Sequence, residues 1–144
     1  IDREYKAVSV GNLRDAQGTV DRPIGRNPRD RKKMAVVPGG RPAVTHYTVA
    51  EQFDGFDLLD LKLETGRTHQ IRVHLSSIGH PLLGDTLYGG GHTKFERQNA
   101  DLLIGQTLHA YRLTFRHPRS GETLCFTAPL PPYFEAILAK LRRL

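Results

Sequence analysis

Alternation of polar and apolar residues recurs along the chain, and each alternating stretch is bounded by turn residues. Five segments are predicted as strands, at residues 5–10, 43–53, 59–64, 108–116 and 122–127. A period of two residues is typical of strands that bury one face. The turn sequence Pro118-Arg119-Ser120-Gly121 joins the last two segments as a hairpin. The chain is therefore expected to fold around antiparallel strands.

One segment in the middle of the chain has a helical period instead. Ile71, Leu75 and Ile78 fall at i, i+4 and i+7, which places them on one face of a helix. Thr68 is the expected N-cap and Gly79 the expected residue just past the C-terminus. A second amphipathic helix is predicted at residues 134–141. At 144 residues the chain fits one domain. We predict an α+β fold with a mainly antiparallel, mixed sheet and few helices.

The chain is basic, with 21 Lys and Arg against 15 Asp and Glu and a net charge of +6. Such a surplus favours a polyanionic partner, most often nucleic acid. The densest basic stretch, residues 22–33, is predicted to be a loop that takes no part in the core. Its basic residues, opposed only by Asp30, are Arg22, Arg26, Arg29, Arg31, Lys32 and Lys33.

A single cysteine, Cys125, excludes an internal disulfide framework and a cysteine-rich zinc site. A reducing, cytoplasmic location is the expectation. The sequence has no apolar run of membrane-spanning length and no signal-peptide pattern, so no membrane partner is expected.

Polar groups are crowded at the start of the central helix, in the segment 64–74. Arg67, His69 and Arg72 lie there, and a helix N-terminus attracts phosphate or carboxylate groups. Arg72 falls on a polar face with His69 and Ser76 and suits a bidentate pair with a carboxylate. The alternative is that the two arginines are solvated surface charges.

Three other features admit ordinary structural interpretations. His69 and His74 are five residues apart and point about 140° away from each other on a helix, which disfavours a metal site. Asp85 lies in a polar turn, where its carboxylate is expected to accept backbone N–H bonds. From pattern alone, Tyr5 is a half-buried core aromatic of the first strand.

Two long motifs resemble the RluA-type pseudouridine synthases. They are Gly66-Arg67-Thr68-His69-Gln70-Ile71-Arg72-Val73-His74 and, after it, Gly79-His80-Pro81-Leu82-Leu83-Gly84-Asp85 with Tyr88-Gly89. The strand Tyr5-Lys6-Ala7-Val8-Ser9-Val10-Gly11 is also similar to that family's tyrosine-containing strand. The segment 18–26 is most similar to members that modify large-subunit ribosomal RNA.

The resemblance implies a pseudouridine synthase fold and the cofactor-free isomerisation of uridine in RNA, by base flipping and exchange of the C–N glycosidic bond for a C–C bond. It implies that Tyr5 lies against the flipped uracil and serves as a base. It also implies that Arg72 pairs with the catalytic Asp and keeps it ionised. Arg67, His69 and the basic stretch at 22–33 are then candidates for RNA contact, with no metal.

The family's catalytic Asp lies in an Arg-Leu-Asp segment upstream of the tyrosine strand, and this chain contains no such segment. Asp2 precedes Tyr5 without that motif, and Asp85 matches another family position. Because the chain starts at Ile1 beside the tyrosine strand, we expect the C-terminal part of a catalytic domain, with no second domain. Such a part should be inactive alone and should expose an unpaired sheet edge.

The expected partner is RNA, with large-subunit ribosomal RNA favoured and transfer RNA left open, and the chain is expected to be a monomer. One alternative is a non-catalytic RNA-binding module that acts through the basic stretch. Another is a basic domain with a protein partner, for which RNA binding would be absent or insensitive to salt.

Overall fold

The computed structural model describes residues 2–144. Ile1, whose position entered the expectation of a partial domain, lies outside the described residues. The elements in chain order are β1 (Asp2–Val10), β2 (Gln17–Asp21), β3 (Ile24–Arg26), β4 (Met34–Val36), β5 (Val44–Phe53), β6 (Phe56–Leu63), α1 (Gln70–Ser77), the short 3-10 turn η1 (Thr86–Tyr88), α2 (Lys94–Gln98), β7 (Leu108–Arg116), β8 (Thr123–Thr127) and α3 (Pro132–Leu141).

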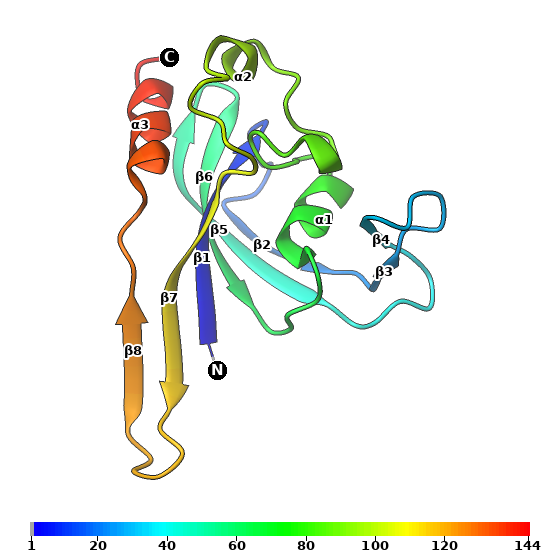
Figure 1. Cartoon of the computed structure of the whole chain (residues 1–144), viewed down its shortest axis with the longest axis vertical. Coiled ribbons are helices and arrows are strands. Elements are labelled where there is room, and N and C mark those ends of the chain that lie inside the picture. Colours follow the sequence, from blue (N-terminus) through cyan, green and yellow to red (C-terminus); the bar gives the residue numbers. More distant parts are fainter. Residues whose placement is uncertain (1) are drawn as a thin grey trace.

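A six-stranded antiparallel sheet organises the molecule, in the order β2-β5-β6-β1-β7-β8. The strands β3 and β4 form a separate hairpin. Figure 1 shows this hairpin and the β7–β8 hairpin projecting from different sides of the body. The α+β fold with a mainly antiparallel sheet is the one predicted.

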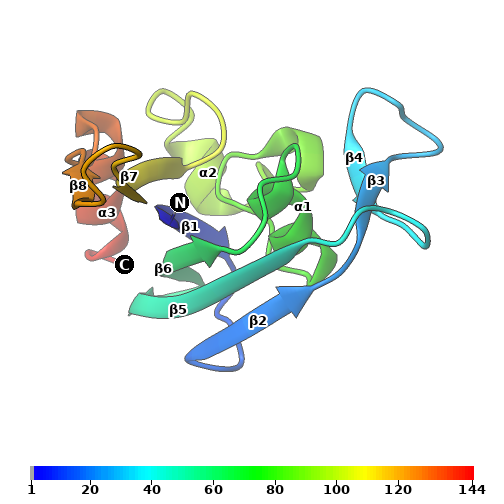
Figure 2. The same cartoon turned by 90° about the horizontal axis from the view of Figure 1, so that it is seen from below.

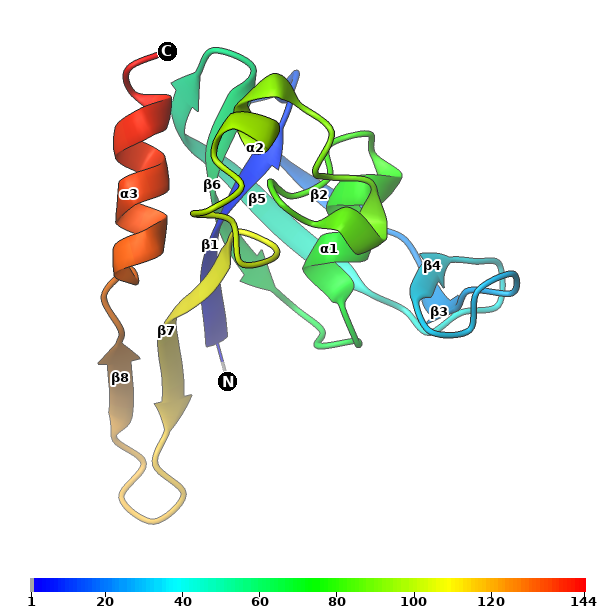
Figure 3. The same ribbon diagram turned by 45° about the horizontal axis from the view of Figure 1, so that its top comes forward.

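The two longer helices cover opposite faces of the sheet centre. Neighbouring residues on a strand point to opposite faces, and Ala7 of β1 packs with Ile71 and Leu75 of α1. The next residue, Val8, packs in a different cluster that includes Phe134 of α3. Figure 2 shows α1 over β5 and β2, and Figure 3 shows α3 continuing beyond β8 on the other side. The central strands β1 and β6 therefore position α1.

The prediction that the basic stretch at 22–33 takes no part in the core was wrong at Ile24. Ile24 is 1% exposed and packs with Ala43, Val73 and Tyr88. The hairpin β3–β4 pairs three residues of each strand. Among these six residues only Ile24 is buried, and it attaches the hairpin to the body of the domain. The exposed basic residues at its tip are thus held against the body of the domain.

The β7–β8 hairpin ends the sheet at an open edge. All five residues of β8 are at least partly accessible to solvent, and Phe126 is 58% exposed. In the described part of the chain, no helix combines the length and apolar character needed to cross a membrane.

Candidate active site

The turn that leads into α1 is held by one buried side chain, that of Gln70. Its Oε1 accepts hydrogen bonds from the Arg67 backbone N–H at 3.0 Å and from Thr65 Oγ1 at 2.8 Å. Its Nε2 donates to the Val44 carbonyl and to Thr45 Oγ1, both at 3.0 Å. All four atoms lie on β5 or on the turn itself. The start of α1 is therefore fixed to the sheet.

The helix begins one residue later than predicted. His69, not Thr68, occupies the N-cap position, and its backbone is left-handed with φ of 54°. This conformation is uncommon outside glycine, although His, Asn and Asp adopt it more readily than most residues. At the other end Ile78 is the C-cap, and Gly79 follows it with φ of 84°, in the role predicted for that glycine.

Arg72 is bound by Asp85 through two parallel hydrogen bonds. Arg72 Nε and Nη2 donate to Asp85 Oδ2 and Oδ1, each at 2.9 Å. The Asp85 side chain is 1% exposed and that of Arg72 is 12% exposed. Hydrogen bonding to Asp85 raises the pKa of Arg72 and outweighs the opposing effect of burial. The guanidinium is therefore charged and held in one orientation.

The expectation that Asp85 accepts backbone N–H bonds in its turn was wrong. Both carboxylate oxygens bond to Arg72, because the polar face of α1 packs against the turn that carries Asp85. The predicted composition of that face was correct. Ser76 Oγ donates to the Tyr88 carbonyl at 2.7 Å, and His69 Nδ1 lies 2.7 Å from the Tyr88 hydroxyl.

Tyr5, Arg72, Arg67 and His69 line one cleft of about 320 Å³. Tyr5 comes from β1, Arg72 from α1, and Arg67 and His69 from the turn that leads into α1. Tyr5 is half-buried and packs beside the β1–α1 core cluster, so it contacts both the core and the cleft. The structure thus brings the two predicted catalytic residues and two of the predicted RNA-binding residues together.

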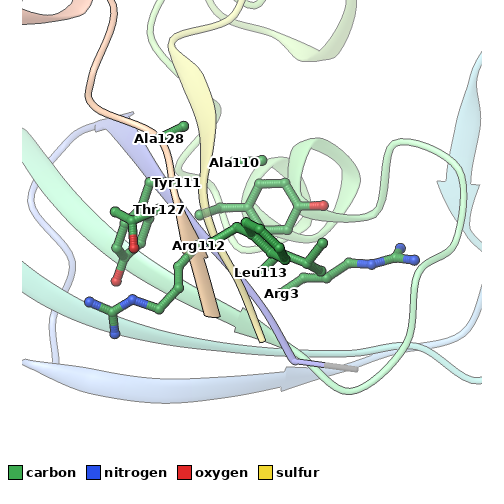
Figure 4. Close-up of a pocket in the computed structure, with 9 residues that line it drawn as sticks. Arg3, Ala110, Tyr111, Arg112, Leu113, Thr127 and Ala128 are labelled. Carbon is green, nitrogen blue, oxygen red and sulfur yellow. The ribbon is translucent and has the colours of Figure 1, made fainter. Parts of the chain in front are cut away.

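A second cleft of about 290 Å³ adjoins the first and shares Tyr5 and Arg3 with it. Its other walls come from β7 and the end of β8. Figure 4 shows Arg3 and Arg112 extending toward opposite sides of this cleft. Arg3 thus lies at the junction of the two clefts, a position that no local sequence pattern indicated.

The predicted RNA-binding residues differ in how freely they meet solvent. Arg26, Arg29, Arg31 and Lys32 are exposed on the β3–β4 hairpin, and Lys33 is half-buried. Arg26 also donates to the Arg31 carbonyl within the hairpin, and two further arginines bond to backbone carbonyls of other segments. The guanidinium of Arg22 donates to the Ser77 carbonyl at the C-terminal end of α1, and Arg67 Nε donates to the Pro42 carbonyl.

The two histidines of the motif have separate surroundings, as their spacing predicted. His74 is fully buried between Thr45 Oγ1 and the Arg22 carbonyl, whereas His69 contacts Tyr88. Burial lowers the pKa of both. Over residues 2–144, no group of three or more His, Cys, Asp or Glu side chains is arranged to bind a metal ion.

Tyr88 and Gln70 are two site residues to which the sequence analysis gave no role. Tyr88 contacts His69, receives the Met34 N–H of β4 at 3.0 Å, and stacks under Arg72, whose Cζ lies 5.0 Å from the ring centre. The only sequence signal for Gln70 and Tyr88 was that they lie inside the two motifs. Their contacts join segments far apart in sequence, which no local pattern reveals.

A sequence model of the family described as RNA pseudouridylate synthase matches residues 1–77. The chain is 50% identical to a ribosomal large subunit pseudouridine synthase D of Vibrio parahaemolyticus, covering 99% of this chain and 46% of that protein. It is 49% identical to a protein of the same name from Nitrosomonas europaea, covering all of this chain and 42% of that protein.

Two solved human structures are similar in fold. RNA Pseudouridylate Synthase Domain Containing 4 gives a TM-score of 0.78 at 28% identity, with 98% of this chain and 62% of that chain covered. Domain Containing 1 gives 0.75 at 29% identity, with 94% and 58% covered. The chain spans less than half the length of the two bacterial relatives. On its sequence and its fold, the chain belongs to the RNA pseudouridylate synthase family.

Proposed function

We propose that the cleft between β1 and α1 receives a uridine of RNA for isomerisation to pseudouridine. The observation that carries this proposal is the meeting of Tyr5 and Arg72 in one cleft, although 66 residues separate them in the sequence. A stacked uridine hides its sugar carbon, so the nucleotide must be flipped out of its helix to enter.

The reaction requires no redox change and no cofactor. The bond between C1′ and N1 breaks, a bond between C1′ and C5 forms, N1 gains a proton, and the hydrogen of C5 leaves to solvent. In the proposed mechanism Tyr5 lies against the uracil and takes up that proton. Arg72 pairs with the nucleophilic carboxylate. Since Asp85 occupies only Nε and Nη2 of Arg72, the Nη1 group stays available for this second partner.

We propose that the chain is the C-terminal part of a catalytic domain and is inactive alone. Its 144 residues contain no Arg-Leu-Asp segment. Asp85 is a poor substitute, since it is almost fully buried and both its oxygens bond to Arg72. A nucleophile needs an oxygen that can reach the sugar carbon.

The proposed substrate is large-subunit ribosomal RNA, bound by a monomer. The names of the bacterial relatives support the class of RNA. The exposed residues Arg26, Arg29, Arg31 and Lys32 supply phosphate contacts in this proposal, with Arg67 and His69 closer to the flipped nucleotide. Arg22 and Lys33 add positive charge in this proposal.

Tritium release from large-subunit RNA labelled at uridine C5 tests the proposal. The chain alone should release none. A chimera that joins the upstream part of the Vibrio relative to this chain should release tritium. In that chimera Tyr5→Phe should lower the rate by about a hundredfold or more, because it removes the proposed base. Tyr47→Phe, a half-buried tyrosine of β5, is the matched control and should keep the rate.

Two results would overturn parts of the proposal. A chimera that binds RNA but releases no tritium would favour the RNA-binding module. Release by the chain alone, abolished by Tyr5→Phe, would show that the missing segment is not needed.

A further inference from the structure

The hydroxyl of Tyr88 lies between two nitrogen atoms whose roles can be assigned. The Met34 backbone N–H can only donate, so Tyr88 Oη accepts from it at 3.0 Å. The hydroxyl proton is then free to be donated to His69 Nδ1, 2.7 Å away. This arrangement satisfies the Met34 N–H, the Tyr88 hydroxyl and His69 Nδ1 together, whereas a proton on Nδ1 would leave the hydroxyl proton without an acceptor.

The contact with Tyr88 places the ring proton of neutral His69 on Nε2. Burial and the charge of Arg72 lower the pKa of His69 and outweigh the opposing effect of Asp85, so the ring is neutral near pH 7. Over residues 2–144, no protein group accepts a hydrogen bond from His69 Nε2, and His69 lines the cleft with Tyr5 and Arg72. A residue that lines the cleft therefore carries a ring N–H group that is free to donate to a ligand.

The ring of His69 is also held in orientation. It meets the Tyr88 ring edge-on, with centroids 5.6 Å apart and planes at 81°. Tyr88 is itself fixed by Arg72, which stacks on its ring, and by the β4 backbone. A donor whose direction is set before the ligand binds loses little entropy on binding.

We propose that His69 binds the target base by donating Nε2–H to a carbonyl oxygen of uracil, and that Tyr88 is the positioning residue that fixes this tautomer. The proposal rests on the proposed function, since it takes a uridine as the occupant of the cleft. Uracil has two exocyclic carbonyl oxygens that accept hydrogen bonds. They suit a histidine whose unprotonated nitrogen is already bound by Tyr88 and whose other nitrogen carries a proton to donate.

The tautomer can be measured on the free chain, independently of any activity. Long-range ¹H–¹⁵N NMR near neutral pH should show His69 protonated on Nε2 and bare on Nδ1. Tyr88→Phe keeps the ring against Arg72 but removes the hydroxyl, so it should shift His69 toward a mixture of tautomers. A wild-type His69 protonated on Nδ1, or a Tyr88→Phe spectrum identical to wild type, would overturn the positioning role.

Base binding is tested with a short oligoadenylate that carries one central uridine, compared with the same RNA carrying an abasic site. His69→Asn is the informative variant, because Asn tolerates the left-handed backbone at this position yet has no group at the place of Nε2. We expect it to bind the uridine RNA about fivefold to tenfold more weakly and the abasic RNA unchanged, which corresponds to one lost hydrogen bond.

The outcomes separate the two proposals. If wild type prefers the uridine RNA and His69→Asn prefers it equally, His69 does not bind the base and the inference is wrong. If His69→Asn weakens both RNAs equally, the residue acts on the RNA backbone or on folding, and the inference again fails. If wild type binds both RNAs alike, the proposed uridine site itself is wrong.

Discussion

The pair formed by Arg72 and Asp85 is the most buried ion pair among the described residues. A buried pair adds little net stability over an apolar substitute, but removal of one partner leaves an uncompensated charge. Arg72 has Asp85 as its only carboxylate partner within residues 2–144. The cost of losing Asp85 should therefore be large.

Asp85→Asn should lower the free energy of unfolding by roughly 3–5 kcal/mol, measured by urea denaturation. The matched control is Glu51→Gln, which breaks the exposed pair of Glu51 with Arg142. That change should cost no more than about 1 kcal/mol. Equal losses in the two variants would mean that burial of the Arg72 pair has no energetic consequence.

His74 should make stability depend on pH. Its Nε2–H donates to the Arg22 carbonyl and its Nδ1 accepts from Thr45, and burial lowers its folded pKa below 6.5. Below pH 6.5 the unfolded chain therefore binds a proton that the folded chain excludes. The contribution of His74 is present above that pH and is lost as the pH falls toward the lowered folded pKa.

The free energy of unfolding should be smaller at about pH 5.5 than at about pH 7.5, and His74→Gln should reduce this difference. His92→Gln removes an exposed histidine and should leave the difference unchanged. An identical pH dependence in His74→Gln and wild type would show that His74 does not titrate in this way.

At the scale of elements, α2 fixes the loop that carries Asp85 and Tyr88. The buried carboxylate of Glu96 accepts from the backbone N–H groups of Gly84 at 2.7 Å and Gly91 at 2.5 Å. It also forms a capping box with Thr93. A five-residue helix thereby joins both ends of the loop.

Glu96→Gln should lower the free energy of unfolding by roughly 2–3 kcal/mol, because an amide donor replaces an oxygen that accepts from backbone N–H groups. Glu135→Gln, at an exposed position of α3, should change it by less than about 0.5 kcal/mol. Urea denaturation measures both variants. A neutral Glu96→Gln would mean that the loop is held without this carboxylate.

The elements that the sequence predicted are those with a strong local pattern. The alternation of polar and apolar residues predicted β7 and β8. The apolar stripe of the central helix predicted α1, and Gly79 predicted where that helix ends. The strand β2 was missed because it has one buried residue, Val20, and its strand character depends on pairing with β5. The N-cap was misplaced because Gln70, rather than Thr68, organises the turn.

The candidate site was predictable in part. Tyr5 and Arg72 were singled out by resemblance, and their meeting in a cleft follows from the packing of α1 on β1. Asp85 was recognised as part of the motif but was given the wrong partner, since the contact depends on how the following loop folds back. Tyr88 could not be predicted as a positioning residue, because its hydroxyl contacts both the Met34 N–H of β4 and His69 at the start of α1.

Across the whole molecule, one cluster of exposed basic residues lies apart from the terminal elements. The β3–β4 hairpin carries Arg29, Arg31 and Lys32 and lies away from α3 and the β7–β8 hairpin (Figure 1). Tyr88 connects β4 to the cleft through the Met34 N–H and His69. RNA held by the hairpin would therefore lie beside the cleft.

Removal of Arg29, Arg31 and Lys32 together by alanine substitution should weaken RNA binding and lower its salt dependence. Three lost contacts to single-stranded RNA correspond to a slope of log affinity against log salt that is smaller by about 2. Alanine at the exposed residues Arg119, Lys140 and Arg143 is the charge-matched control and should leave the slope nearly unchanged. Equal reductions in both triple variants would show that RNA binding follows net charge only.

We propose that a uridine enters the cleft lined by Tyr5, His69 and Arg72. Photocrosslinking with an RNA that carries one 4-thiouridine, followed by mass spectrometry of the crosslinked peptides, tests it most directly. We expect crosslinks at Tyr5 or within residues 63–72, and their loss when unlabelled uridine RNA competes. Crosslinks confined to β8 or to the β3–β4 hairpin would contradict it.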